Sequence, residues 1–330
     1  MELLYWFQSI RTPVLDVLMS LVTHLGEETF FMVAAMLVFW CVDKRKGYYL
    51  LTVGFVGTVI NQWLKIVCRI PRPWIRDPNF SIVEAARAEA TGYSFPSGHT
   101  QSAVGYLGGI ARFTKVTWLR IVCIVLALLT AVSRMYLGVH TPADVGVSLA
   151  VSVVLVFVIY PLMESTLWFP NRMYWIVGAM LALSLAFVGF MEFYPFPADV
   201  DMENLAHAVK NSYTMAGAVA GVLAVYVLDS KWIRFSNRAP WWGQLIKLVG
   251  GLALAVLVKS LLKAPLLSLC GGHDVAHLLV QVPGHMPLIS SQSPDPFRSS
   301  CSQVCRLSSL QQKLNQACQQ TSRRQVLQNG

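Results

Sequence analysis

Three short motifs, which together span about 80 residues, carry side chains suited to phosphate chemistry. A phosphate ester is a dianion near neutral pH; the fork of Arg matches its oxygens two at a time, and Lys supplies a point charge. One imidazole can accept a phosphoryl group, and a second can move protons. These residue types predict transfer of a phosphoryl group to a histidine and then to water. The motif residues are Lys65, Arg72, Ser97, Gly98, His99, Arg134, His140 and Asp144.

The three cations lie at the ends of apolar stretches. Lys65 and Arg72 flank the end of one stretch, and Arg134 lies at the end of another. Clustering of those helix ends would bring the three charges around one phosphate. The alternative is that long cationic side chains simply reach for the membrane–water interface. We favour phosphate binding because the other two motifs accompany the cations.

The second motif, Pro96-Ser97-Gly98-His99, has the features of a helix start. Ser97 is a good cap, and the helix N-terminus offers free N–H groups to an anion. Gly98 allows close approach of the backbone to a phosphate. His99 would then lie in the first turn, where an imidazolium can protonate a leaving oxygen. An ordinary capped helix with an interfacial histidine is the alternative.

The third motif ends in His140-Thr141-Pro142-Ala143-Asp144, which also opens an apolar stretch. Thr141 suits the N-cap, Pro142 the first helical position and Asp144 the third, so the carboxylate has a structural role available. Asp144 also follows His140 by four residues, within reach of a hydrogen bond to the ring. Such a bond would fix the tautomer and leave the other nitrogen as the nucleophile. The two roles are compatible.

Composition places the chain in the membrane class. Of its 330 residues 55% are hydrophobic and 13% are charged, against about 25% charged in a soluble domain. A span needs about 20 mostly apolar residues. We therefore predict an all-α fold, a polytopic transmembrane helical bundle. The expected spans are 27–43, 47–68, 98–114, 117–138, 142–163, 172–194, 212–229 and 245–267, with 3–23 as a weaker candidate.

Loop charges orient these spans. Basic loops lie at Lys44-Arg45-Lys46, from Arg112 to Arg120, and over 229–247. Cytoplasmic loops collect Lys and Arg, so the three motifs are expected on the opposite, extracytoplasmic face. The net charge of +9 therefore indicates topology, and no nucleic-acid partner is expected.

The motifs KX6RP, PSGH and SRX5HX3D together resemble those of the type 2 phosphatidic acid phosphatase family, over about residues 26–165. The resemblance implies a six-span core and a phosphohistidine mechanism without metal or cofactor. It also implies roles for the motif residues. His140 would be the nucleophile, Asp144 its orienting partner, and His99 the general acid and then base. Lys65, Arg72, Ser97, Gly98 and Arg134 would cradle the phosphate.

The chain divides into four expected parts. Residues 1–25 form an interfacial or first membrane helix, 26–165 the catalytic core, 166–280 two to three additional spans, and 281–330 a polar, disordered tail. The family core usually has three spans before its first motif, so 3–23 must serve as one despite Arg11 and Pro13. The connection 74–95 is either a lid or substrate-access loop, or a linker with a short helix at 82–90.

We expect an integral protein of a bacterial plasma membrane that hydrolyses a lipid phosphomonoester or pyrophosphate. The partners are membrane lipids and a substrate of the undecaprenyl pyrophosphate, phosphatidylglycerol phosphate or phosphatidic acid class. A lipid phosphotransferase using the same site, and a non-catalytic lipid-binding or transport protein, are the alternatives. The composition change after about residue 279 also resembles out-of-frame translation of a last span. Two lesser signals, the pairs His273/His277 and Lys259/Lys263, are not expected to form sites.

Overall fold

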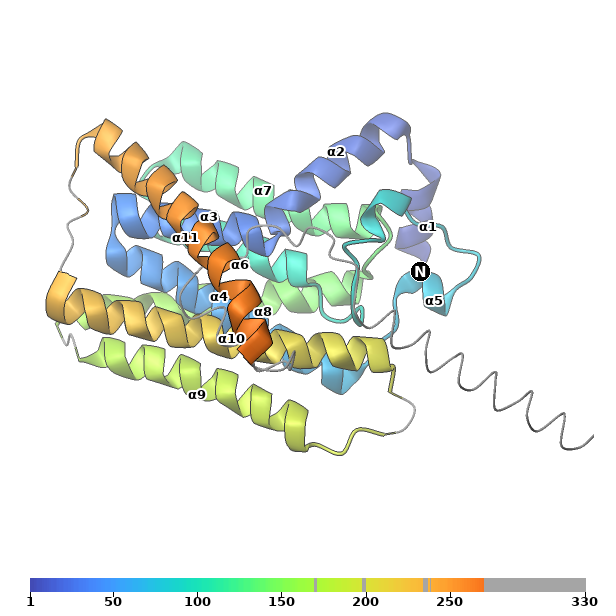
Figure 1. Cartoon of the computed structure of the whole chain (residues 1–330). Helices are drawn as coiled ribbons and strands as arrows, with labels where there is room; N and C mark the ends of the chain where they lie inside the picture. The colour runs from blue at the N-terminus through green and yellow to red at the C-terminus, as the bar shows by residue number, and fades with distance from the viewer. Residues whose placement is uncertain (169–170, 198–199, 234–236, 238, 270–330) are drawn as a thin grey trace, which may run out of the picture. The chain divides into compact units, whose positions relative to one another are not determined.

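The structure is a computed structural model that describes residues 1–168, 171–197, 200–233, 237 and 239–269, all in one unit of contacts. The prediction of an all-α fold is confirmed, since the described residues contain helices and no strand. The expected tail and the pair His273/His277 lie outside the described residues, as do the side chains of Lys259 and Lys263. The helices are α1 Glu2–Ser9, α2 Pro13–Thr23, α3 Glu28–Leu37, α4 Lys44–Cys68, α5 Pro73–Arg76, α6 Gly98–Phe113, α7 Thr117–Tyr136, α8 Pro142–Glu164, α9 Arg172–Phe193, α10 Met202–Leu228 and α11 Trp241–Leu269 (Figure 1).

Most of the expected spans form long helices, but the expected span 98–114 forms α6, which has only 16 residues and is not among the candidate spans. Five described segments that contain α4, α7, α8, α9 and α10 are long and apolar enough to cross a membrane. A bent pair, Pro13–Gly26 with Glu28–Val42, would make a sixth span. Helix α10 begins ten residues before the expected start at 212, because Asp201 caps it by accepting hydrogen bonds from the backbone of Glu203 and Asn204.

The expected single span 3–23 is wrong. The chain forms two helices here, because Thr12 caps α2 and Pro13 occupies its first position. The Arg11 side chain between the helices donates to the carbonyls of Tyr136 and Ser81, which ties this break to the end of α7 and to the connection 74–95. The bent pair of α2 and α3, broken by 53° near Gly26, replaces the expected first two spans.

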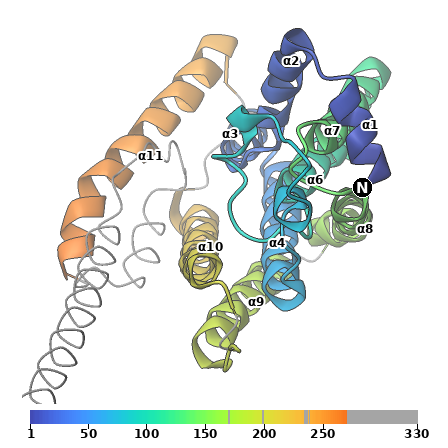
Figure 2. The ribbon, with the colours of Figure 1, turned by 90° about the vertical axis from the view of Figure 1, so that its right-hand side faces the viewer.

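Helix α6 lies at the centre of the catalytic half and packs against α4, α7 and α8 (Figures 1 and 2). It has 16 residues, about 24 Å at 1.5 Å per residue. Most of its residues are buried by neighbouring helices. The Tyr49 hydroxyl of α4 donates to the carbonyl of Val156 in α8 at 2.8 Å and ties the two flanking helices together. Helices α9 and α10 pack against each other and against α4, with Trp63 stacked on Phe190 at 4.9 Å.

Successive antiparallel helices bring four helix ends to one end of the bundle. They are the C-terminal ends of α4 and α7 and the N-terminal ends of α6 and α8. Figure 1 shows α1 and α5 at this same end. The three motifs occupy these helix ends, so the bundle positions all of them on one side. Two of the expected basic loops lie at the opposite end, because Lys44, Arg45 and Lys46 begin α4 and residues 112–120 connect α6 to α7.

The connection 74–95 folds against the motif-bearing end. It contains α5 and one 3-10 turn, Glu84–Ala86, in place of the alternative helix at 82–90. Phe80 and Ile82 are buried, and the Val83 backbone donates to the carbonyl of Leu137 at 3.1 Å. These contacts hold the connection in place against the helix ends that carry the motifs.

Candidate active site

The loop between α7 and α8 holds His140 rigidly. Its side chain is 2% exposed, and its neighbours Leu137 and Val139 are fully buried. Gly138 has a φ of +82° and lies so close to Arg11 and Phe80 that a Cβ would approach them to 2.8 and 2.9 Å. Only glycine fits both the left-handed backbone and the close approach. The loop therefore holds His140 at a fixed position next to the connection 74–95.

The surroundings of His140 define its tautomer. Arg72 Nη1 lies 3.0 Å from Nε2, and a guanidinium can only donate. Nε2 therefore carries the lone pair, and the proton lies on Nδ1, which faces Asp144 Oδ2 at 3.5 Å. Burial and the cations Arg72, Arg134 and Lys65 hold the pKa of His140 well below its usual range. The ring is neutral at neutral pH, with its unprotonated nitrogen on the side of Arg72.

Asp144 makes both contacts that the sequence predicts: it caps α8, and it faces the His140 ring. Thr141 accepts a hydrogen bond from the Asp144 backbone, and Asp144 Oδ2 accepts one from the Thr141 backbone at 2.8 Å, which completes a capping box. The same oxygen also accepts from the Ser94 hydroxyl at 2.5 Å and faces the His140 ring. These two donors and the helix cap hold the carboxylate in place beside the ring.

The three motif cations surround His140 from different elements. Arg72 is held by the carbonyls of Thr91, Gly92 and Val139 at 2.7–3.1 Å. Lys65 donates to the carbonyl of Tyr93 at 2.5 Å. Fully buried Arg134 donates to the Thr23 hydroxyl at 2.6 Å. Carbonyls and a hydroxyl hold these groups without neutralising them, so the pocket keeps a positive field for an anion.

The second motif begins α6 as predicted. The Ser97 side chain accepts from Thr100, and the Ser97 backbone donates to the Asp144 carbonyl at 3.2 Å. A Cβ on Gly98 would find only Asn61 Oδ1, at 4.0 Å, so there is open space next to this helix start. The N–H groups of Gly98 and His99 stand at positions that have no intrahelical acceptor. This helix start is suited to an anion.

His99 faces a small acidic cluster that sequence reasoning did not identify. Its Nε2 lies 3.8 Å from Glu89 Oε2, and Glu89 Oε1 lies 3.7 Å from His24 Nδ1. Glu27 also contacts His24. The interaction with His99 is the main cause that lowers the pKa of Glu89, so this carboxyl is ionised. Burial and the nearby Arg134 charge lower the pKa of His99, and the ionised Glu89 offsets this shift only in part.

Four buried polar atoms around this centre have no hydrogen-bond partner. They are Arg134 Nε, His140 Nδ1, His99 Nε2 and Glu89 Oε2. Each unpaired buried polar atom costs free energy, on the order of 1–3 kcal/mol. Such groups gathered at one place between motif residues indicate a site whose partner is a ligand.

The comparisons with known proteins agree with this geometry. A family model described as the PAP2 superfamily matches residues 45–168, and one described as PAP2 superfamily phosphatase, transmembrane extension, matches residues 213–282. Undecaprenyl-diphosphatase BcrC of Bacillus subtilis is 31% identical over 155 residues, which cover 46% of this chain and 77% of that protein. The chain belongs to the PAP2 superfamily. It is an integral membrane phosphatase.

Two further PAP2 relatives show the breadth of the family. Phosphatidylglycerophosphatase B of Bacillus subtilis is 28% identical over 167 residues, which cover 46% of this chain and 76% of that protein. A probable sphingosine-1-phosphate phosphatase of Dictyostelium discoideum is 33% identical over 159 residues, which cover 44% of this chain but only 38% of that protein. No solved structure matches the chain.

The structure brings the motif residues together around His140 and adds residues that the motifs do not contain. Arg72, Arg134, Lys65 and His99 all act electrostatically on the His140 ring. The additions, Ser94, Thr23 and Glu89, hold Asp144, Arg134 and His99 respectively. Glu89 lies in the connection 74–95, outside the three motifs, so the motif pattern did not identify it.

Proposed function

We propose that this PAP2 protein hydrolyses a phosphomonoester or pyrophosphate of a membrane lipid through a phosphohistidine on His140. The observation that carries the proposal is the buried His140 ring, with its unprotonated Nε2 against Arg72 and its Nδ1 facing Asp144. This arrangement provides a neutral nucleophile within a cationic pocket, as in-line attack on a phosphate requires.

In the first step, Nε2 of His140 attacks phosphorus and the bond from phosphorus to the lipid oxygen breaks. His99 gives a proton to the departing oxygen, and the proton on Nδ1 of His140 stays directed at Asp144. Lys65, Arg72, Arg134 and the N-terminus of α6 stabilise the negative charge on the equatorial oxygens. The lipid leaves as an alcohol or, from a pyrophosphate, as a monophosphate.

In the second step, His99 takes a proton from water, and the oxygen of that water attacks phosphorus. The bond from phosphorus to Nε2 breaks, inorganic phosphate leaves, and His140 regains its lone pair. Glu89 supports His99 in both steps because its negative charge favours the protonated ring.

The substrate class follows from the position of the site. The proposed nucleophile, His140, lies between the ends of α7 and α8, helices that are long and apolar enough to cross a membrane, where a lipid headgroup would meet water. Undecaprenyl pyrophosphate, phosphatidylglycerol phosphate and phosphatidic acid are the candidates, and the first two agree with the names of the bacterial relatives. The basic loops at the other end favour an extracytoplasmic site in a bacterial plasma membrane.

Phosphate release from these three lipids in detergent, with wild type and His140→Ala, tests the proposal. Wild type is expected to release inorganic phosphate with or without EDTA, and His140→Ala none. Equal release by both proteins would refute the mechanism. Loss of wild-type activity with EDTA would refute the metal-free reaction and direct attention to His24, Glu27 and Glu89, whose ligand atoms lie within 4.8 Å of one another.

A lipid phosphotransferase would use the same phosphohistidine with an acceptor alcohol in place of water. The open space beside Gly98 would admit either acceptor. Product analysis in the presence of a diacylglycerol separates the two reactions. Inorganic phosphate as the sole product supports hydrolysis, and a phosphorylated acceptor supports transfer.

A further inference from the structure

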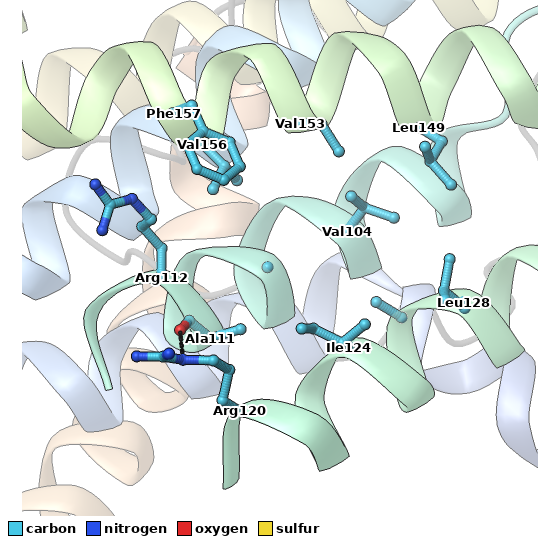
Figure 3. Close-up of a pocket in the computed structure, with 12 residues that line it drawn as sticks. Val104, Ala111, Arg112, Arg120, Ile124, Leu128, Leu149, Val153, Val156 and Phe157 are labelled. Carbon is cyan, nitrogen blue, oxygen red and sulfur yellow. Dashed lines mark hydrogen bonds between the residues drawn. The ribbon is translucent and has the colours of Figure 1, made fainter. Parts of the chain in front are cut away.

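A cavity of about 400 Å³ lies between α6, α7 and α8 (Figure 3). It is lined by residues between Val104 and Arg112 of α6, between Arg120 and Leu128 of α7, and between Leu149 and Phe157 of α8. His99 and Arg112 are separated by 13 positions on α6, or roughly 20 Å along the helix. The arginine end of the cavity is therefore far from the substrate site, whereas Val104 and Leu149 at its other end lie five positions from His99 and Asp144, or roughly 7.5 Å along their helices.

Small side chains on two helices create this groove. Gly108 and Ala111 of α6 and Ala127 of α7 line it, and a Cβ on Gly108 would meet nothing closer than Val156 at 3.7 Å. The walls are apolar and open to the surroundings, with Leu128 48% exposed. In a membrane this opening faces lipid, so an apolar chain can enter from the side.

Two arginines lie at one end of the groove (Figure 3). Arg120 donates to the carbonyls of Ala111 and Thr114 at 3.1 and 2.7 Å. Arg112 rests over the Tyr160 ring at 4.5 Å. Within the part of the chain that the structure describes, neither arginine forms an ion pair with a carboxylate. Their positive charge is thus available to an anion at the groove mouth.

We propose that this groove binds an anionic phospholipid from the leaflet opposite the catalytic site. One acyl chain occupies the crevice between α7 and α8, and the headgroup phosphate lies between Arg112 and Arg120. Basic pockets between membrane helices on the cytoplasmic side are suited to anionic headgroups. The cavity volume falls in the usual range for small-molecule sites, about 300–1,000 Å³.

A helix from a second copy fits these features less well. An α-helix with its side chains is about 10–12 Å wide, and the groove floor is a single helix, α6, between two neighbours. The exposed arginines would also need acidic partners on that second helix. The lipid supplies both an apolar chain and a phosphate, so it matches the whole surface.

Native mass spectrometry of the delipidated full-length protein tests the proposal, with phosphatidylserine and phosphatidylcholine as probes. Both are phosphodiesters, so neither is a substrate or product of a phosphomonoesterase. Wild type is expected to bind phosphatidylserine more tightly. Arg112→Gln with Arg120→Gln should weaken that binding about 25-fold, at about fivefold for each arginine. Lys115→Gln, in the same loop but outside the groove, should change it less than twofold.

A second variant tests the apolar part of the site. Gly108→Leu should fill the crevice and abolish selective binding while both arginines remain. Gly178→Leu is the matched control, because a Cβ at Gly178 of α9 has nothing within 4 Å. Equal affinity of wild type for the two lipids would overturn the proposal. So would unchanged binding in the double arginine variant, or a lipid-free dimer that Gly108→Leu dissociates.

Discussion

Replacement of Gly26 by alanine tests whether the backbone around His99 is set by its contact with the bend between α2 and α3. A Cβ at Gly26 would lie 2.7 Å from both the carbonyl oxygen and the Cβ of His99. The Tyr106 hydroxyl donates to the Leu25 carbonyl at 2.8 Å, so this turn is tied to α6. The added methyl group cannot be accommodated by a side-chain rotation, and the two backbones must separate.

The structure gives the size of that separation. An ordinary contact begins near 3.4 Å, so the backbones must separate by roughly 0.7 Å. Active-site groups generally have to be held within about 0.5 Å, and a displacement of 1 Å can cost about 100-fold in rate. We therefore expect Gly26→Ala to lower kcat by about 10- to 100-fold with little change in KM. Overpacking of this kind also destabilises a fold by roughly 1–3 kcal/mol.

Phosphate release from a short-chain lipid phosphate in detergent measures this effect, with a thermal melt to show that the variant is folded. Gly178→Ala is the control, since its Cβ would meet nothing within 4 Å, and it should retain wild-type kcat. A folded Gly26→Ala protein with kcat within twofold of wild type would show that the bend does not position His99.

Three other predictions concern the groups around the two histidines. Glu89→Gln should lower kcat roughly tenfold, equivalent to ~1.4 kcal/mol, and shift the pH profile of kcat. Glu84→Gln, in the same connection, should do neither. Unchanged pH profiles in both variants would show that Glu89 does not act on His99. Ser94→Ala removes a hydrogen-bond donor from the buried Asp144 carboxylate. The free energy of unfolding in a denaturant titration should fall by about 1.5–3 kcal/mol. An unchanged free energy of unfolding would contradict the contribution of this hydrogen bond. Because the His140 pKa lies well below its usual range and the neutral ring is the nucleophile, kcat/KM corrected for substrate ionisation should not fall between pH 7.5 and 6 and should fall only at more acid pH. Protonation of His99, whose pKa is also lowered, can only raise the rate over this range. A fall centred near 6.5 would contradict this.

The sequence predicted the helix starts at the site because capping is local. Ser97, Thr141 and Pro142 lie next to the helices that they begin, so their residue types were enough. The same local logic explains the wrong span at 3–23. Thr12 and Pro13 are a helix start too, and they end any continuous helix at that point.

The contacts that support the site could not be read from spacing. Thr23 meets Arg134 across 111 residues, and Ser94 meets Asp144 across 50. Such pairs depend on how α2, α6, α7 and α8 pack, and the periodicity of a single sequence does not reveal that packing. From the sequence, Arg112 and Arg120 likewise indicated only membrane topology, because the groove that they border forms only when α6, α7 and α8 pack together.

The central claim is that His140 carries the phosphoryl group, and trapping of that intermediate tests it most directly. His99→Asn should slow attack by water, so an isoprenoid pyrophosphate labelled at its terminal phosphate should leave label on the protein after an alkaline quench. That substrate is suitable because its phosphate leaving group needs less help from an acid. Peptide mapping by mass spectrometry is expected to find the phosphoryl group on His140 and none in the double variant with His140→Ala. Label on another residue, or turnover by His140→Ala without label, would contradict the account.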